Sequence, residues 1–238
     1  MNISSALFIS AMLLTAVSSS CAQSRITKDQ FEVSNFTAIE SSIVGNINIS
    51  QSPRTGVIAE GDEDLLDILE VRMENNTLVL NMSERNIKRF NNRKEKLDIT
   101  ITTPTLTYVN MEGVGNLNIE GVFETPELII DSEGVGNMKA LNINAGFVKI
   151  ESEGVGNITV AGRSDEVEIT SEGVGNIDAG DLVSLSTIAV SEGIGNVSCH
   201  ATGYLRAVSE GIGNITYYGN PKQTDLSKNG IGKIRAGR

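Results

Sequence analysis

Glu112-Gly113-Val114-Gly115-Asn116 is the stretch that decides the fold, because it returns along the chain at nearly constant spacing. Further copies begin at Glu133, Glu153 and Glu172, and copies with Ile in place of Val begin at Glu192 and Glu210. A degenerate seventh copy surrounds Gly230. The repeat of about 20 residues is shorter than helical repeats of about 34 residues or a propeller blade. It therefore predicts a solenoid with one coil per repeat.

On both sides of each glycine motif, hydrophobic and polar residues alternate, as in strands with one buried face. The expected inward residues before the motif are Leu128, Ile130, Val148, Ile150, Val167 and Ile169. Those expected after it are Leu117, Ile119, Met138, Ala140, Ile158, Val160, Ile177, Ala179, Val197, Cys199, Ile215 and Tyr217. The sequence thus predicts an all-β fold, a single-stranded parallel β-helix. Its predicted hand is right, since parallel crossovers take that hand.

The motif itself is predicted to form a turn ladder at the corner between two faces. We expect the glycines to supply positive φ angles that a Cβ would forbid, and the asparagines to hydrogen-bond to their own copies in neighbouring coils. The central members of this ladder are Gly134, Gly136, Asn137, Gly154, Gly156, Asn157, Gly173, Gly175 and Asn176. The full row of asparagines adds Asn116, Asn196 and Asn214.

Outside the regular repeats of residues 111–220, the pattern weakens at both ends of the predicted solenoid domain, residues 31–220. Residues 42–49 are a half-copy of the motif. Residues 61–96 are expected to be an insertion, in which Asp62 caps a short helix and Asn75-Asn76 turns a hairpin. Residues 221–238 are predicted to be a C-terminal capping coil, where Lys233 replaces the ladder asparagine.

The N-terminal 22 residues have the pattern of a secretory signal peptide. An apolar run from Ala6 to Val17 is followed by small residues. Two cleavage sites compete: one would leave Cys21 as a lipidated N-terminus, and the other would cut after Ala22. We therefore expect an exported protein that is an outer membrane lipoprotein or lies in the periplasm or at the cell surface.

Composition restricts the partners and the core. The net charge of −11 speaks against nucleic acid, whose phosphates need a basic surface, and against adhesion to anionic lipid. Contact with a membrane is expected only through the lipid anchor. The chain has 24 glycines, no tryptophan and few other aromatic residues, which favours the thin aliphatic core of stacked coils.

With these repeats, the chain resembles the bacterial family named putative auto-transporter adhesin, head GIN domain. The resemblance is carried by the repeated Glu-Gly-[Val/Ile]-Gly-Asn motif, the exported N-terminus and the predicted insertion of a helix with Leu65-Leu66 and a hairpin. It covers about residues 31 to 220. It implies a right-handed β-solenoid at the cell envelope, with no established enzymatic activity and no agreed catalytic residues to carry over.

Stacked glutamates are the main candidate for chemistry. Neighbouring carboxylates about 5 Å apart would repel each other by roughly 0.8 kcal/mol in water. Calcium could relieve this repulsion, and Glu133, Glu153, Glu172 and Glu192 are weak candidates for such a site. We expect instead a solvated stripe with some glutamates bonded to turn amides, and no metal or other cofactor.

Other candidate residues have simpler structural explanations. The basic stretch 85–96 is expected to be a solvated loop, although it could dock a neighbour's glutamates or envelope phosphates. Cys199 falls on the inward phase, and His200, the one histidine, on the outward phase. Tyr204, Tyr217 and Tyr218 could form a sugar-binding patch with His200, but packing beneath the last coil is the expected role of the tyrosines.

The predicted function is that of a noncatalytic envelope solenoid, an adhesin-like or scaffold protein and not an enzyme. Its partner is an unidentified protein or glycan. The alternatives are a glycan-active β-helix enzyme, which would need a cleft, and a calcium-dependent binding module, which would melt at a metal-dependent temperature. Flat solenoid faces and ends also allow copies to stack, so homo-oligomers are a further expectation.

Overall fold

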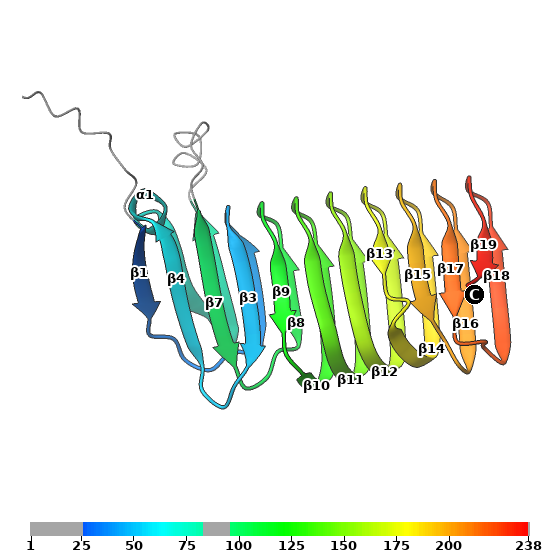
Figure 1. Cartoon of the computed structure of the whole chain (residues 1–238), viewed down its shortest axis with the longest axis horizontal. Helices are drawn as coiled ribbons and strands as arrows, with labels where there is room; N and C mark the ends of the chain where they lie inside the picture. The colour runs from blue at the N-terminus through cyan, green and yellow to red at the C-terminus, as the bar shows by residue number, and fades with distance from the viewer. Residues whose placement is uncertain (1–25, 83–95, 238) are drawn as a thin grey trace, which may run out of the picture.

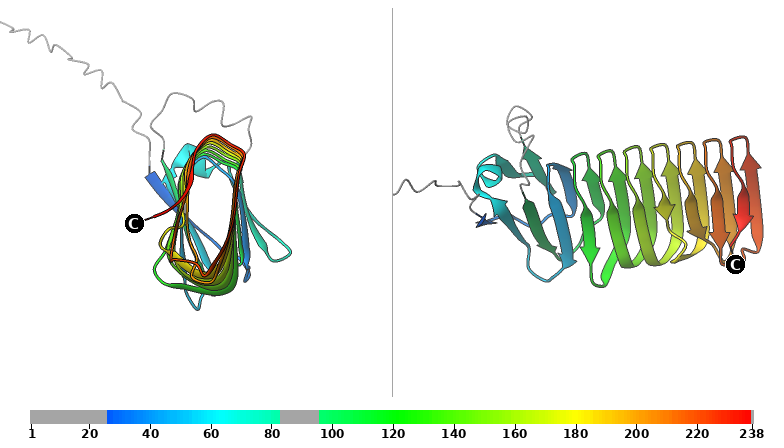
Figure 2. Two further views of the ribbon diagram at one scale, coloured as in Figure 1. Left: turned by 90° about the vertical axis from the view of Figure 1, so that its right-hand side faces the viewer. Right: turned by 45° about the horizontal axis from the view of Figure 1, so that its top comes forward.

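Each repeat forms one coil, with a strand before and a strand after the glycine motif. The computed structural model describes residues 26–82 and 96–237. Within them the coils stack side by side along one long axis (Figure 1). Viewed down that axis, they superpose on a flattened, closed outline (Figure 2, left). The prediction of a parallel β-solenoid with about 20 residues per coil is confirmed.

The strands that precede the glycine motif form one face, called here the first sheet. From the N-terminal end its order is β5 (Leu69–Glu74), β6 (Thr77–Met82), β2 (Ala38–Ser42), β8 (Tyr108–Met111), β10 (Phe123–Ser132), the second halves of β11 (Met138–Ser152) and β12 (Ile158–Ser171), β14 (Leu182–Ser191), β16 (Tyr204–Ser209) and β18 (Gln223–Lys228). All neighbours are parallel except β5 and β6.

The strands that follow the motif form the opposite face, the second sheet. Its order is β1 (Ile26–Phe31), β4 (Gly56–Asp62), β7 (Leu97–Thr103), β3 (Asn46–Gln51), β9 (Leu117–Glu120), the first halves of β11 and β12, β13 (Ile177–Asp178), β15 (Val197–His200), β17 (Ile215–Tyr218) and β19 (Ile234–Ala236). Antiparallel pairing is confined to β1, β4 and β7 at the N-terminal end.

The half-copy at residues 42–49 is not the first coil of the stack. Its strands β2 and β3 pair on one side with β6 and β7, which come later in the chain, and on the other side with β8 and β9. In Figure 1 the blue β3 accordingly lies between the green β7 and β9. The coil joins the repeats through a parallel bridge between Val44 and Val114.

A short helix and a hairpin close the N-terminal end, as expected for residues 61–82. The helix α1 (Glu63–Leu66) places Leu65 and Leu66 in the core. Asp62 occupies the N-cap position of α1, but its side chain makes no capping bond and instead accepts a hydrogen bond from the backbone N–H of Lys96, at 2.7 Å. The second strand of the hairpin, β6, is part of the stack because it pairs with β2.

Aliphatic side chains from both sheets fill the interior. All the expected inward residues are buried except Tyr217, which is partly buried against the core. The interior also holds Phe36 and Phe123, the largest of its fully buried side chains. A core of this thickness suits branched aliphatic residues, which explains the low aromatic content.

Two different corners join the sheets. The glycine motif makes one of them, the glycine corner. At the other, β11 and β12 continue from one sheet to the other, with a register shift after Ala140 in β11. Here Thr125, Ala145, Ser164 and Ser184 are neighbours in consecutive coils. Because hydroxyl groups dominate this row, we call it the hydroxyl corner.

The last coil, made by β18 and β19, continues the regular pairing. Lys228 lies next to Ser209, at the phase that faces the interior in earlier coils, and is exposed. Among residues 26–82 and 96–237, no helix has the length and apolar character needed to cross a membrane. The predicted signal peptide with Cys21, and most of the basic stretch 85–96, lie outside the described residues.

Candidate functional site

The glycine corner is built by strict alternation of outward and inward residues. In each Glu-Gly-Val-Gly-Asn copy the side chains of Glu, Val and Asn are turned outward. A Cβ on either glycine would instead point at the backbone of the neighbouring coil. Backbone hydrogen bonds cross the corner in both directions, as in Val135 N–H to Gly113 O and Gly136 N–H to Val155 O, both at 2.9 Å. The corner therefore presents three parallel rows of side chains along the solenoid.

The two glycines of each motif are required for different reasons. The second one, at Gly136, Gly156 and Gly175, has φ between 151° and 157°, which disfavours other residues. The first one, at Gly134, Gly154 and Gly173, has no positive φ. A Cβ at Gly134 would lie 2.2 Å from the carbonyl oxygen of Gly113, so here the close approach of the next coil excludes a side chain. The expected positive φ thus holds for the second glycine alone.

The asparagines lie in one continuous hydrogen-bonded ladder. Each Nδ2 donates to the Oδ1 of the preceding copy at 3.0–3.1 Å, and the same Oδ1 accepts the next asparagine's backbone N–H. The rungs are Asn46, Asn116, Asn137, Asn157, Asn176, Asn196 and Asn214. The ladder starts one coil earlier than expected, where Asn46 donates to Asp98, and it ends where Lys233 N–H donates to Asn214.

The glutamate row runs along the other side of the corner. Its members are exposed, and two of them accept hydrogen bonds: Asn110 Nδ2 donates to Glu133 and Ser42 Oγ to Glu112, both at 2.9 Å. The candidates Glu133, Glu153, Glu172 and Glu192 come from four consecutive coils. In the part of the chain that the structure describes, no three His, Cys, Asp or Glu side chains are grouped closely enough to hold a metal ion.

Beside this row, one carboxylate is affected by its neighbours. Asp131 lies on the first sheet next to Asn110 and Glu151. Its partial burial raises its pKa above the ordinary value, and the charges of Glu133, Glu151 and Glu153 raise it further. Stacking acidic residues in register therefore has an electrostatic cost on this face.

Between the glutamates and the asparagines runs an exposed aliphatic row. It consists of Val44, Val114, Val135, Val155, Val174, Ile194, Ile212 and Ile231. Their exposed fractions run from 36% for Val44 to 72% for Ile231, with most near one half. This row was not among the features predicted from the sequence. The sequence does contain a signal for it. If the two-residue period of a strand is extended through the motif, the glycines face inward and the valine faces outward.

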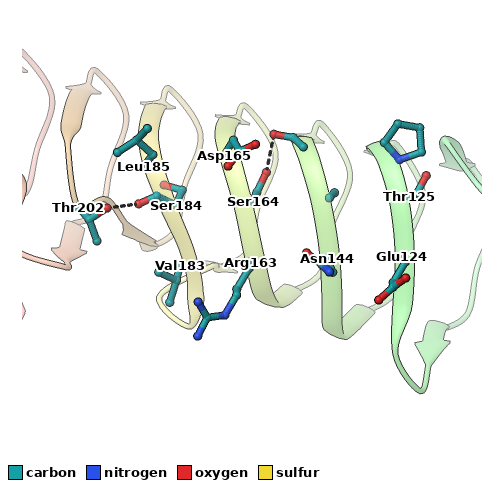
Figure 3. Close-up of a pocket in the computed structure, with 13 residues that line it drawn as sticks. Glu124, Thr125, Asn144, Arg163, Ser164, Asp165, Val183, Ser184, Leu185 and Thr202 are labelled. Atoms are coloured by element: carbon teal, nitrogen blue, oxygen red, sulfur yellow. Dashed lines mark hydrogen bonds between the residues drawn. The ribbon is translucent and has the colours of Figure 1, made fainter.

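A shallow hollow of about 690 Å³ covers the outer side of the hydroxyl corner (Figure 3). Its charged lining residues are Glu124, Arg163 and Asp165, which come from β10 and β12, with the β11 coil between them. Beneath it, the one hydroxyl hydrogen of Ser164 lies between two acceptors, Gly146 O and Glu166 O, and that of Thr125 lies between Leu106 O and Glu127 O. These hydroxyls hold the bends but face the backbone.

A second hollow of about 640 Å³ lies on the second sheet, beside the asparagine ladder. It is lined by Asn46, Asn48, Asp98, Asn116, Asn118, Asn137, Lys139, Asn157 and Thr159. Asn118 Nδ2 donates to Asn48 Oδ1 at 3.0 Å, which makes a second, shorter amide ladder beside the first. The side chains that line this hollow are all polar and comprise amides, one hydroxyl, the Lys139 ammonium and the Asp98 carboxylate.

Cys199, His200 and the tyrosines do not form one site. Cys199 is fully buried, and burial raises the pKa of its thiol to about 12. His200 Nδ1 contacts Gly180 O at 3.0 Å, and His200 pairs with Tyr218 on the second sheet. Tyr204 is on the first sheet in β16, on the opposite side of the coil. The suggested sugar-binding patch therefore lacks one of its members.

The comparisons with known proteins agree with this architecture. The family model described as "Putative auto-transporter adhesin, head GIN domain" matches residues 35–221. A similar solved structure is a putative adhesin from Bacteroides fragilis, 33% identical, with a TM-score of 0.84 over 90% of this chain and 98% of that chain. No curated protein matches the chain.

Two more distant structures share the fold. A putative lipid binding protein from Parabacteroides distasonis is 22% identical, with a TM-score of 0.70 over 90% of this chain and 97% of its own. A putative adhesin from the same species is 19% identical, with a TM-score of 0.64 over 91% of this chain and 98% of its own. At these identities the similarity extends to the fold alone.

Proposed function

We propose that this chain, which belongs to the family described as "Putative auto-transporter adhesin, head GIN domain", is an exported, noncatalytic protein of the cell envelope that holds a rigid patterned surface against a partner. The partner is a protein or a glycan. The proposed export rests on the predicted signal peptide; acylation of Cys21 would anchor the chain, and cleavage after Ala22 would release it.

The observation that carries the proposal is the amide-lined hollow on the second sheet. Its polar groups come from consecutive coils held at the spacing of β-strands, about 4.8 Å. Amide, hydroxyl and ammonium groups can donate to the hydroxyls of a glycan or to the carbonyls of a peptide. Because the solenoid backbone fixes these groups in place, this chain would lose little conformational entropy when a partner binds to them.

The absence of enzymatic activity is part of the proposal and is supported by the hydroxyl corner. Glu124 and Asp165 belong to coils separated by a third coil, and both border an open, shallow hollow (Figure 3). A glycan-cleaving enzyme needs an acid and a base on either side of one bond, within a cleft that holds the sugar chain. Incubating the purified chain with envelope polysaccharides should release no new reducing or unsaturated ends.

The first test of the function is the position of the solenoid in the cell. Intact cells that express a C-terminally tagged copy are treated with protease, and lysed cells serve as the control. Cleavage on intact cells supports contact with surfaces outside the cell. Full protection until lysis contradicts an adhesin-like role and directs the search to periplasmic partners.

The second test asks whether the amide-lined hollow is the contact surface. Thr159→Arg places a bulky charged side chain in the hollow, and Thr216→Arg places the same side chain in the same outward row of the second sheet, beyond it. Adhesion of cells to glycan and matrix-protein arrays should fall roughly tenfold for Thr159→Arg and stay unchanged for Thr216→Arg. Equal adhesion of both variants would contradict this choice of surface.

A further inference from the structure

The exposed aliphatic row has no structural explanation within a single chain. Extended backbone at the corner favours β-branched residues, and threonine meets that requirement as well as valine or isoleucine. Yet all eight positions are Val or Ile, although each side chain is roughly a third to three quarters exposed. Contiguous apolar surface rimmed by polar residues is typical of a contact with another molecule.

The three rows of the glycine corner have the anatomy of a protein interface. The eight aliphatic residues form an apolar centre, and six glutamates and seven asparagines form a polar rim on either side. Together these rows offer 21 residues, while stable interfaces use about 20–30 residues on each side. We propose that these three rows, called here the ridge, form the contact between two parallel copies of this chain.

A second copy is the partner whose spacing fits. The residues of the aliphatic row are held one coil apart, at the distance between paired strands, about 4.8 Å. A flat row of eight side chains can be covered along its whole length by a row with the same spacing. Another copy supplies such a row, so each coil meets the equivalent coil of its partner.

Charge determines the orientation of the pair. In a parallel pair the twofold axis runs along the solenoid. This axis places the glutamate row of each copy opposite the asparagine row of the other, and the asparagine amides can donate hydrogen bonds to the carboxylates. If the axis is perpendicular to the solenoid, glutamates face glutamates along the whole ridge, which is unfavourable for like charges. The parallel arrangement is therefore the favoured one.

A parallel pair has a consequence for the envelope. Two chains anchored at the same end on one surface already run in the same direction, so the ridge would join neighbours on one cell. Such pairing would cover the asparagine edge of the amide-lined hollow and leave its other residues on the second sheet, among them Asn48, Asn118 and Thr159, open to a partner. The pairing does not depend on adhesion and can be tested on the purified protein.

The first experiment measures the mass of the full-length chain in solution by sedimentation equilibrium, in a Cys21→Ser background. We expect a dimer for this parent. Changing Val155 and Val174 together to lysine should weaken association by roughly 100-fold, since both lie at the centre of the row. Leu141→Lys is the matched control, because Leu141 is 49% exposed, like Val155 at 51%, but lies in β11 away from the ridge.

The outcomes separate cleanly. Circular dichroism verifies that all three proteins are folded, which is expected because the substituted side chains are exposed. A monomeric parent up to about 100 μM, or a dimer that the Val155 and Val174 substitutions leave intact, would overturn the proposal. So would a dimer that Leu141→Lys disrupts to the same extent.

The second experiment tests the parallel orientation with single cysteines at the second and the seventh of the eight positions in the row. In a parallel pair Val114→Cys should form a disulfide with its own copy, and so should Ile212→Cys, because equivalent coils meet. In an antiparallel pair neither variant links to itself, and a disulfide forms only when the two variants are mixed. Linking in the mixture alone would refute the parallel pair, and the parent with buried Cys199 controls for background.

Discussion

The two corners of each coil solve the same problem in different ways. At the glycine corner the backbones approach so closely that a Cβ at Gly136 would lie 1.6 Å from the carbonyl oxygen of Gly115. At the hydroxyl corner most positions carry side chains, although Gly162 has a φ of 136° in one coil, and Ser164 or Thr125 ties the bend to carbonyl oxygens. One corner excludes side chains, and the other accommodates them and carries a hydroxyl group in most coils.

This difference explains which part of the coil repeats in the sequence. Where a Cβ cannot fit, glycine is obligatory in every coil, so the motif is regular and visible. Where side chains fit, the row can hold Thr125, Ala145, Ser164 and Ser184, and the residues beside it differ from coil to coil. The hollow of Figure 3 lies at this variable corner.

The largest expected effect comes from breaking the glycine corner. Gly156→Ala combines a φ of 153° with a Cβ that would lie 1.6 Å from Gly136 O, so it should lower the free energy of unfolding by about 3–5 kcal/mol. Gly146→Ala, at the hydroxyl corner, should cost less than about 1 kcal/mol because its Cβ would lie 3.0 Å from Pro126 O. Urea unfolding followed by circular dichroism measures both, and equal losses would contradict the distinction between the corners.

A smaller effect is expected from the asparagine ladder. Asn157→Ala removes the acceptor of both Asn176 N–H groups and a donor to Asn137, which should cost about 1–2 kcal/mol. Asn214→Ala removes a rung at the end of the ladder, where Oδ1 accepts from Lys233 N–H, and should cost about half as much. The same urea titration compares them. A terminal rung that costs as much as the central one would show that the ladder does not act through its bonds.

The sequence predicted the inner half of this molecule well. The period of two placed Leu128, Val148 and Val167 in the core because a strand has only two faces, and the structure buries all three. The motif predicted the corner because glycine is the one residue that fits there. These are local requirements, so a single sequence reveals them.

Other features depend on contacts between distant segments. The order of the coils could not be predicted, since the pattern of residues 42–49 defines a strand-turn-strand unit but not its neighbours β6 and β8. The hydroxyl corner was missed because one serine or threonine per coil is too common to be noticed. The aliphatic row was overlooked for another reason: apolar residues were assigned to the core, and Val135 lies between two glycines where the phase turns it outward.

Removing one hydroxyl tests the other corner. Ser164→Ala deletes the bonds from Oγ to Gly146 O and Glu166 O and should cost about 0.5–1 kcal/mol, less than a central rung of the asparagine ladder. The neighbouring coil already has Ala145 at this position, which indicates that the loss is tolerated. Ser164→Thr keeps the hydroxyl and should retain most of the stability in the same titration. A loss above about 3 kcal/mol would mean that this corner is as demanding as the glycine corner.

The smallest effect concerns the negative charge of Asp131, which lies beside the glutamate row of the glycine corner. The pKa of Asp131 is higher in the folded state than in the unfolded chain. Between these two pKa values the folded state keeps a proton that the unfolded chain has released, so stability falls as pH rises through this window. Asp131 therefore lowers stability at neutral pH, and this cost disappears below the ordinary pKa. Asp131→Asn should raise Tm by about 1–2 °C at pH 7 and by less near pH 3, measured by differential scanning calorimetry.

Glu124→Gln is the control for this prediction at the hydroxyl corner. Glu124 shares its row with Asn144 and Arg163, so removing its charge relieves no crowding of carboxylates. Its Tm at pH 7 should stay equal to or fall slightly below that of the parent. If Asp131→Asn lowers Tm at pH 7, repulsion from the neighbouring carboxylates is not a net cost to stability at this position.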